Sequence, residues 1–472
     1  MALHSTYEVR WKNFKGFKDT NWIKIKPITI LLGPNNSGKT SFIAPFLLMN
    51  QTISSRDSAT PLIIKGKMYD GGNIKELSHG YDLSKEIFFG FKYHTHTPEE
   101  YHKHLKKGKK IEKIGTYPPG AFEVSFGINN EKDRDLTVRQ ETVYDIFYRE
   151  FFSLTRNKKG EYELTGGEFK KITDTEKNTI ANSSPLNFLL SPNSILSAHR
   201  KEEKKNPDKE TKSKGFSEDF SKFIQSVSYN YSEAIDTIGE ISYLGPIRDN
   251  PHRYYEVGNE NYNTVGHKGE NTANLLKKNI KEIQKELNEW VQKFGFGDDV
   301  ELKELSSTIH SIIFNDHNTE TYTNIANAGF GASQILPLIV QALLSPKESL
   351  TIAEQPEIHL NPKLQCVLAD LFAFMAKKDQ RVIVESHSEH LLLRLRYLVA
   401  NKTLTSDDIA IYFIEKESGV STIKEIKIET DGHINPVEWP KGFFEDTLRE
   451  SLALATEQIK NRPKSTTKTK TK

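Results

Sequence analysis

The feature that most constrains the fold is a buried strand that runs directly into a glycine loop. Ile28–Leu32 is a nearly continuous apolar run, the pattern of a strand covered on both faces. The next residues, Gly33–Thr40, match G-x-x-x-x-G-K-[ST] at every fixed position, and a helical pattern follows from Ser41. Strand, glycine loop and helix in this order predict a phosphate-binding loop in an α/β protein.

Each fixed position of this loop has a chemical reason. The glycines let backbone N–H groups turn toward phosphates, Lys39 reaches the β- and γ-phosphates, and the Thr40 hydroxyl ligates Mg²⁺. The helix that starts near Lys39 adds the positive end of its dipole. We therefore expect nucleotide binding with Mg²⁺. The expected contact residues are Gly33, Pro34, Asn35, Asn36, Ser37, Gly38, Lys39, Thr40 and Ser41.

A second segment supplies the acid that such a loop needs. An enzyme with this loop holds Mg²⁺ with a carboxylate at the end of a neighbouring strand. The apolar run Leu350–Ala353 is followed directly by Glu354, Gln355 and, two positions later, Glu357. We expect Glu354 to join Thr40 as a Mg²⁺ ligand. Gln355 or Glu357 would then position the attacking water.

The rest of the chain indicates an α/β fold with a mixed sheet covered by helices. Strand patterns at 350–353 and 381–384 alternate with helical patterns at 364–377 and 389–399, and 409–429 has the alternation of antiparallel strands. Charged residues become more frequent between about 130 and 235, which predicts a helical, charged insertion. The expected units are an N-terminal lobe (1–129), an inserted and partly mobile lid or arm (130–235), a C-terminal lobe (236–450) and a basic disordered tail (451–472).

Composition excludes several classes of protein. With 65 Lys and Arg against 63 Asp and Glu, the chain has no overall basic charge that would favour nucleic acid. DNA contacts would need a local basic patch, such as His102–Lys113 or His199–Lys214, in which acidic residues are mixed with the basic ones. A single cysteine, Cys366, excludes a disulfide framework and a multi-cysteine zinc site. The longest apolar run, Ile335–Leu344, is far shorter than the roughly 20 residues of a membrane span. We expect a cytoplasmic protein without membrane contact.

Four segments occur in an order that resembles a known family. They are Gly33–Thr40, Gly329–Gln334, Glu354–Pro362 and Glu385–His390. The set resembles the ABC-type ATPase heads of the OLD/RecF/SMC-like group, most of all those of prokaryotic anti-phage defence systems such as the AriA-type ATPase subunits of PARIS. The likeness spans about 1–125 and 240–450. Further similar stretches are Asn13–Phe17, Tyr243–Arg248 and Trp439–Phe444.

The resemblance implies roles for individual residues. The fold would be an ABC-type head that binds ATP and Mg²⁺ and forms homo-oligomers with ATP at the subunit interfaces. Gly329–Gln334 would be the signature loop that caps the γ-phosphate held by a second subunit, with Gly329, Gly331, Ser333 and Gln334 at the nucleotide. His387 would be the switch histidine that senses the γ-phosphate.

One departure from the family pattern bears on turnover. The usual acidic pair is Asp-Glu, with the second carboxylate polarising water, whereas this chain has Glu354 and Gln355. A glutamine cannot act as general base, although it can orient water. We therefore expect slow hydrolysis, and a nucleotide-binding scaffold without turnover is an alternative. The expected catalytic residues are Lys39, Glu354, Gln355, Glu357 and His387.

Two functions from different classes fit these features. The first is an ATPase that regulates a separate toxic effector in anti-phage defence, with a phage protein as the trigger. The resemblance implies a TOPRIM nuclease as the effector, because OLD-type proteins often carry one, whereas the residues after His387 in this chain contain Asp407-Asp408 but no Asp-x-Asp. The second is a RecF/SMC-like ATPase that clamps DNA in repair.

Overall fold

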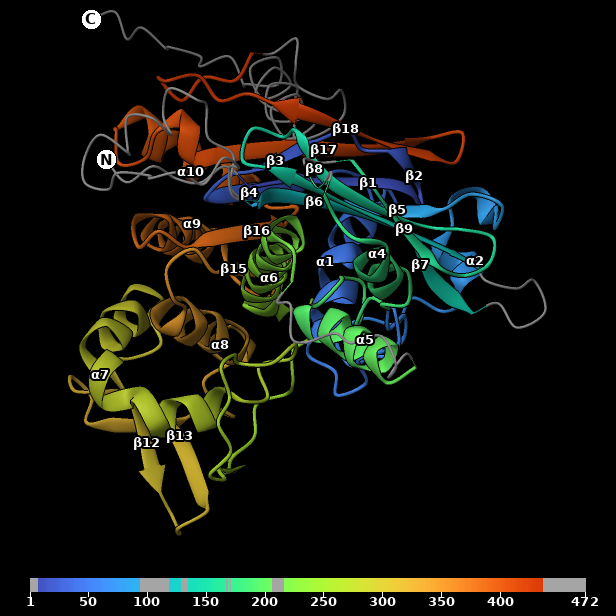
Figure 1. The fold of residues 1–472 in the computed structure, drawn as a ribbon. Helices are drawn as coiled ribbons and strands as arrows, with labels where there is room; N and C mark the ends of the chain where they lie inside the picture. Colours follow the sequence, from blue (N-terminus) through green and yellow to red (C-terminus); the bar gives the residue numbers. More distant parts are fainter. Residues whose placement is uncertain are drawn as a thin grey trace, which may run out of the picture.

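The computed structural model describes residues 7–93, 119–128, 135–166, 169, 171–205 and 216–435 (Figure 1). Several sequence features lie outside them: the basic cluster His102–Lys113, residues 206–214 of the run His199–Lys214, the segment Trp439–Phe444 and the tail 451–472.

A six-stranded central sheet carries the phosphate loop. Its order is β10 (Ile241–Leu244), β15 (Leu350–Glu354), β16 (Arg381–Glu385), β4 (Ile28–Leu32), β17 (Ile409–Glu417) and β18 (Val420–Ile426). Neighbouring strands are parallel except for the antiparallel pair β17–β18. The α/β fold with a mixed sheet is thereby confirmed, and β17 pairs in parallel with β4 as well as antiparallel with β18.

An eight-stranded antiparallel sheet lies beside the central one (Figure 1). Its order is β2 (Phe17–Asp19), β1 (Tyr7–Phe14), β5 (Ile87–Lys92), β6 (Pro119–Ile128), β7 (Leu136–Asp145), β8 (Glu150–Arg156) and β9 (Tyr162–Thr165), with β3 (Ile23–Ile25) paired to β1. Strands β6 and β7 pair across the expected boundary at 129–130, so β7–β9 continue the sheet of the N-terminal lobe. The division into a lobe and an inserted lid stays a prediction.

A small third sheet and the helices complete the described fold. The sheet has β11 (Tyr255–Glu256), β13 (Ile309–Asp316), β12 (Asp299–Glu304) and β14 (Thr321–Asn324). The helices are α1 (Lys39–Ile53), α2 (Ile74–Leu77), α4 (Asp174–Ala181), α5 (Pro192–Lys205), α6 (Glu218–Gly239), α7 (Thr272–Lys293), α8 (Phe330–Leu344), α9 (Pro362–Lys377) and α10 (Glu389–Ala400), with short 3₁₀ turns η1 (His79–Tyr81) and η2 (Ser406–Asp408).

The central sheet is buried on both faces. Leu31 on β4 joins a core shared with α1, α6 and the antiparallel sheet, whereas Ile30 and Leu32 join a second core with α7, α8, α9 and α10. Every residue of β4 and β15 is buried, as the continuous apolar runs predict. This two-sided burial holds the strand ends, and therefore the phosphate loop, in a rigid frame.

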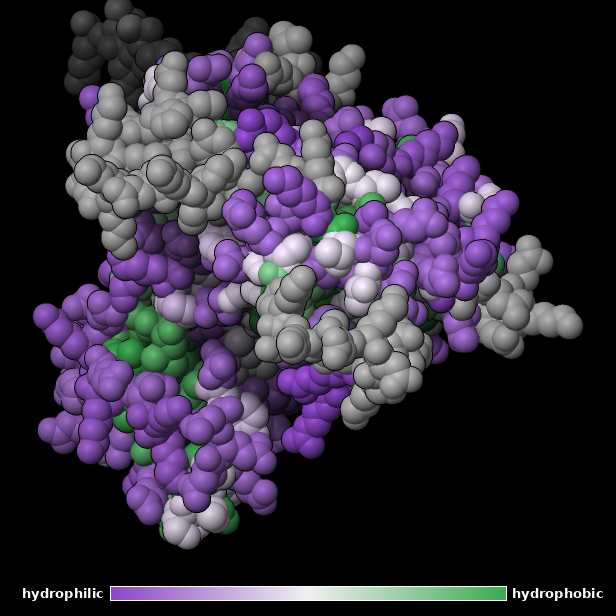
Figure 2. Space-filling model, in the orientation of Figure 1, coloured by the Kyte–Doolittle hydropathy of each residue, from purple (hydrophilic) through white to green (hydrophobic). Residues whose placement is uncertain are grey.

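The face of the molecule drawn in Figure 2 is mostly hydrophilic, with a hydrophobic area over the region of α7 and α8. Among the described residues, no helix is both long enough and apolar enough to cross a bilayer.

Trp11 joins the antiparallel sheet to the helix after the phosphate loop. Its side chain is fully buried and packs against Phe42 and Phe46 of α1 and against Phe89 and Phe91 of β5. Its indole N–H donates a hydrogen bond of 3.0 Å to the Phe42 carbonyl oxygen. The position of α1 thus depends on one aromatic cluster.

We expect Trp11→Ala to lower the free energy of unfolding by about 3–5 kcal/mol, because it leaves a cavity in the core and removes the indole hydrogen bond to Phe42. Trp11→Phe should cost less, since it keeps most of the packing. Chemical denaturation of the purified variants measures both. Tyr397→Ala, at a side chain that is 53% exposed, is the control, and a loss equal to that of Trp11→Ala would contradict the assignment.

Candidate nucleotide-binding site

The phosphate loop connects β4 to the first turn of α1. Gly33 and Gly38 have backbone φ angles of +144° and +117°, which L side chains rarely adopt, and Asn36 has a φ of +63°. Pro34 and Asn35 are exposed, Ser37 is buried, and Thr40 is exposed at the start of the helix. The loop therefore presents an accessible tip above the buried end of β4.

Lys39 lies inside this loop. Its ammonium donates hydrogen bonds to the carbonyl oxygens of Gly33 and Pro34, both at 2.9 Å, and lies 3.7 Å from the Glu385 carboxylate. Burial lowers the pKa of Lys39, and the charge of Glu385 opposes that shift. A buried cation held in this position can compensate the negative charge of phosphates.

Two carboxylates converge on Thr40. The Thr40 hydroxyl lies 3.4 Å from Glu354 Oε2 and 3.2 Å from Glu385 Oε2. The parallel register explains the convergence, since Glu354 of β15 is directly opposite Glu385 of β16, which in turn is opposite Leu31 of β4. Oxygen ligands of this kind are those that Mg²⁺ prefers.

Burial and mutual repulsion shift the titration of this acidic pair. Burial, followed by the charge of Glu385, raises the pKa of Glu354 to about 7. Burial also raises the pKa of Glu385, and the nearby Lys39 ammonium opposes that rise. The Tyr243 hydroxyl donates a hydrogen bond of 2.8 Å to Glu354 Oε1 and stabilises its charged form.

The peptide between Glu354 and Gln355 is held from both sides. Arg248 Nη2 lies 3.3 Å from the Glu354 carbonyl oxygen, and the Gln355 N–H donates to the Glu385 carbonyl oxygen at 2.7 Å. Gln355 has a φ of +45° and a half-buried side chain. The two bonds fix the turn that carries Gln355, the expected water-orienting residue, directly after the acidic strand.

Glu357 and His387 form the next layer. The His387 backbone N–H donates a hydrogen bond of 2.7 Å to Glu357 Oε1. Burial raises the pKa of Glu357, while burial and the Lys39 charge lower the pKa of His387, so the neutral imidazole is favoured. The structure thus brings His387, Glu357, Gln355 and Glu354 to the edge of the sheet where Lys39 and Thr40 lie.

Several buried polar atoms around this edge have no hydrogen-bond partner among the described residues. They are Ser37 Oγ, Glu357 Oε2, His387 Nε2, and Arg248 Nε and Nη1. Such atoms are costly unless a water, ion or ligand pairs with them. Arg248 is only 5% exposed, and burial lowers its pKa to about 10 against the opposing charge of Glu357.

The expected signature segment lies at the start of α8. Gly329 precedes the first turn of α8 with a φ of +79°, and Phe330 is 52% exposed with its ring against His359. Ser333 is buried and its hydroxyl donates to the Phe330 carbonyl oxygen at 2.9 Å. Among the hydrogen bonds of the described residues, none joins 329–334 to 33–41.

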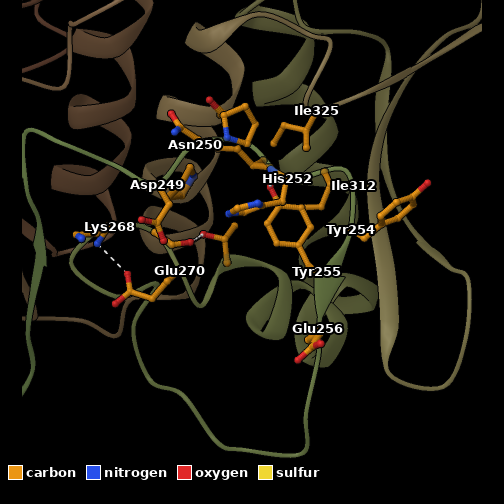
Figure 3. A pocket seen from close by; sticks show the side chains of 16 residues that line it. Asp249, Asn250, His252, Tyr254, Tyr255, Glu256, Lys268, Glu270, Ile312 and Ile325 are labelled. Atoms are coloured by element: carbon orange, nitrogen blue, oxygen red, sulfur yellow. Dashed lines mark hydrogen bonds between the residues drawn. The ribbon is translucent and has the colours of Figure 1, made fainter.

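A pocket of about 340 Å³ lies beside this segment and not at the phosphate loop. Asp249, His252, Tyr255 and Lys268 line it together with Ser333 (Figure 3). Figure 3 shows the His252 ring next to Tyr255, whose hydroxyl accepts a hydrogen bond from the His252 backbone N–H at 3.2 Å. The lining of this pocket carries both acidic and basic groups. The pocket therefore differs in position and in charge from the Glu354–Glu385 carboxylate pair.

The residues at the phosphate loop fit a nucleotide with Mg²⁺. The loop glycines have the backbone conformation that such a cradle needs, and the Thr40 hydroxyl stands between two carboxylates. Within the described residues no group of three or more His, Cys, Asp or Glu side chains could hold a metal ion by itself. Mg²⁺ usually takes one or two carboxylates and completes its shell with phosphates and water.

A comparison with protein families decides the identity of this fold. Residues 7–392 match the family described as AAA ATPase domain, which covers most of the chain. The chain belongs to the AAA ATPase domain family. Membership implies nucleotide binding, and the phosphate loop and the carboxylate pair both lie within the matched residues. Residues 404–454 match a second family, described as a protein of unknown function (DUF3696).

Other comparisons give distant likenesses. No curated protein matches the chain. Solved structures similar to it include the SmcHead bound to the C-winged helix domain of ScpA (12% identity, 90% of this chain and 98% of that chain, TM-score 0.41). The SMC head domain from Thermotoga maritima gives 10% identity, 90% and 100% coverage and a TM-score of 0.36. The Smc head domain bound to the C-terminal domain of ScpA derived from Pyrococcus furiosus is 14% identical, with 96% of this chain and 99% of that chain covered and a TM-score of 0.38.

Sequence reasoning missed four residues of this AAA ATPase site. Glu385 had a usable signal, because it ends the second of two adjacent apolar strands, as Glu354 ends the first. Tyr243 and Arg248 lie in a stretch noted only for its family resemblance, and nothing local in the sequence reveals that they reach Glu354. Ser421, whose hydroxyl donates to the Ser37 carbonyl oxygen at 2.7 Å, is more than 380 residues away from the loop in sequence.

The raised pKa of Glu354 predicts a pH-dependent stability. In the unfolded chain this carboxyl ionises near its usual pKa, whereas in the folded protein it stays neutral up to about pH 7. Its stabilising contribution is therefore present at pH 5 and is lost as the pH rises through 7. The melting temperature without Mg²⁺ should fall from pH 5 to pH 8 by more in the wild type than in Glu354→Gln.

Thermal melts of both proteins over this pH range measure the difference. Glu256→Gln, which changes an exposed carboxylate outside the site, is the control. An equal fall of the melting temperature from pH 5 to pH 8 in wild type and Glu354→Gln would show that the acidic pair does not resist ionisation.

Proposed function

We propose that this AAA ATPase is a slow, ATP-driven switch that closes on a second copy of itself and regulates a separate effector in anti-phage defence. The observation that supports ATP turnover most directly is the position of the Thr40 hydroxyl between Glu354 and Glu385. A nucleotide-binding loop and a carboxylate pair thus meet at one point.

The chain's own residues then have distinct tasks. Backbone N–H groups of Gly33–Thr40 hold the phosphates, and Lys39 exchanges the Gly33 and Pro34 carbonyls for phosphate oxygens. Mg²⁺, when held by Thr40 and the acidic pair, neutralises charge that develops on the phosphates. Lys39 already bonds within the loop and pairs with Glu385, so phosphate binding replaces existing contacts.

Slow turnover follows from the groups available to the attacking water. Gln355 can orient water but cannot take its proton. Glu357 is buried and already accepts a hydrogen bond from the His387 N–H, which limits it as a base. Phosphoryl transfer depends mainly on positioning and electrostatics, so hydrolysis continues at a low rate.

We expect the wild-type protein to hydrolyse ATP more slowly than about 10 s⁻¹, the median of enzymes. Lys39→Ala should abolish turnover by removing the charge that offsets the phosphates. Phosphate release with Mg²⁺ measures both. Lys24→Ala, an exposed lysine of β3, is the control. Faster wild-type turnover, or full activity in Lys39→Ala, would contradict this part of the proposal.

The start of the expected signature segment, Gly329 and Phe330, is exposed and supports closure on a second copy, whereas Ala332–Gln334 are buried. Phe330 is 52% exposed, and the segment 329–334 makes no hydrogen bond to 33–41 of its own chain among the described residues. A segment that must cap a γ-phosphate from this position would do so on a partner chain. ATP would act by binding the closed assembly better than the open one.

Substitutions in this segment should separate nucleotide binding from assembly. Ser333→Arg should leave ATP binding to the single chain and block ATP-dependent assembly and hydrolysis. Phe330→Arg changes an exposed side chain at the same surface and carries less risk to folding. Light scattering with and without ATP measures assembly, with Tyr397→Arg, 53% exposed on α10, as the control. Normal hydrolysis in both variants would refute the signature-loop role.

The effector and the alternative function call for a different experiment. A TOPRIM nuclease held by an assembly of PARIS type, with a phage protein as trigger, is the partner we propose. Affinity purification from the host with mass spectrometry would find this nuclease at fixed stoichiometry.

The alternative function is that of a RecF/SMC-like clamp on DNA. A dimer that carries only DNA, lost steeply as salt rises, would favour the clamp.

A further inference from the structure

The hairpin of β17 and β18 closes against the phosphate loop. Strand β17 pairs in parallel with β4 as far as Phe413 opposite Leu32, so Ile414 comes next to Gly33. A Cβ atom on Gly33 would lie 2.1 Å from the Ile414 carbonyl oxygen, far inside any allowed contact. The first glycine of the loop is therefore required by the hairpin as well as by the backbone conformation.

A second contact closes the other end of the loop. Ser421, at the start of β18, is 3% exposed, and its hydroxyl donates a hydrogen bond of 2.7 Å to the Ser37 carbonyl oxygen. Its own N–H donates to the Gly16 carbonyl oxygen at 2.8 Å. Cβ atoms on Gly38 and Gly16 would lie 2.8 Å and 2.3 Å from Ser421 Oγ. Three segments that are distant in sequence thus meet at one serine hydroxyl.

These contacts bear on the conformation that binds phosphate. A phosphate cradle needs its backbone N–H groups turned inward and its carbonyl groups turned away, because a carbonyl oxygen repels a phosphate oxygen. Ser421 engages the carbonyl of Ser37, which lies between Asn36 and Gly38, and so opposes rotation of that peptide. Both loop glycines are pinned by the same hairpin, one by Ile414 and the other by Ser421.

We infer that Ser421 is a positioning residue of the phosphate loop, and that the β17–β18 hairpin sets how readily the loop accepts nucleotide. The hairpin lies in the segment matched by the family of unknown function, which gives that segment a role in the ATPase site. The inference rests on the proposed binding of ATP at this loop. Any partner that displaces the hairpin would change nucleotide affinity through the contacts at Gly33 and Ser37.

The test compares two buried serines, Ser421 of β18 and Ser349, which directly precedes β15. Ser421→Ala should weaken ATP and ADP binding about fivefold, the effect of losing one net hydrogen bond. It should also speed hydrogen exchange in residues 33–40. Ser349→Ala is the matched control, since Ser349 is 4% exposed and its hydroxyl donates to the Pro346 carbonyl oxygen at 2.7 Å, at the opposite end of β15. The control should leave both measurements unchanged.

Equal ATP affinity and equal loop exchange in the two variants would overturn the inference and leave nucleotide binding itself intact. Failure of the wild type to bind ATP would instead remove the proposed function. If Ser421→Ala does not fold, the wild type still gives an answer. Addition of ATP should slow hydrogen exchange in residues 415–422 together with 33–40. Unchanged hydrogen exchange in 415–422 on addition of ATP would refute the coupling.

Discussion

The parallel register of three strand ends is the constraint on which the site depends. Leu31 of β4, Glu385 of β16 and Glu354 of β15 stand side by side, and the phosphate loop begins two residues after Leu31. A slip of one residue in β15 would move the carboxylate to the opposite face of the sheet. The apolar runs that bury these strands on both faces prevent such a slip. The core therefore supplies the precision of the site.

This arrangement has an electrostatic cost that the surrounding groups offset in part. Burial, and for Glu354 also the charge of Glu385, makes these carboxylates at the sheet edge resist ionisation, as their raised pKa values express. Lys39 pairs with one of them and Tyr243 donates to the other. A divalent cation relieves the same repulsion more fully. This resistance to ionisation would favour the binding of a cation of the kind that we propose for this site.

The sequence predicted local features well and long-range ones poorly. The strands at 28–32, 350–353 and 381–384 and the helices at 364–377 and 389–399 are confirmed, because burial leaves a periodic signal in a short window. The phosphate loop and the acidic strand end were predicted from the residues that directly follow two of these strands. Arg248 and Ser421 could not, since their contacts to Glu354 and Ser37 depend on how separate segments pack. Glu385 falls between these cases, because strand adjacency would have revealed it.

The C-terminal hairpin shows that family boundaries do not coincide with physical units. The AAA ATPase match ends at 392 and the family of unknown function begins at 404, yet β4 lies between β16 of the first region and β17 of the second. Without β17, β4 would become an edge strand with unpaired backbone groups directly before the phosphate loop. Gly33 would also lose its contact with Ile414. The second region is therefore part of the ATPase fold, and nucleotide affinity can be controlled from it.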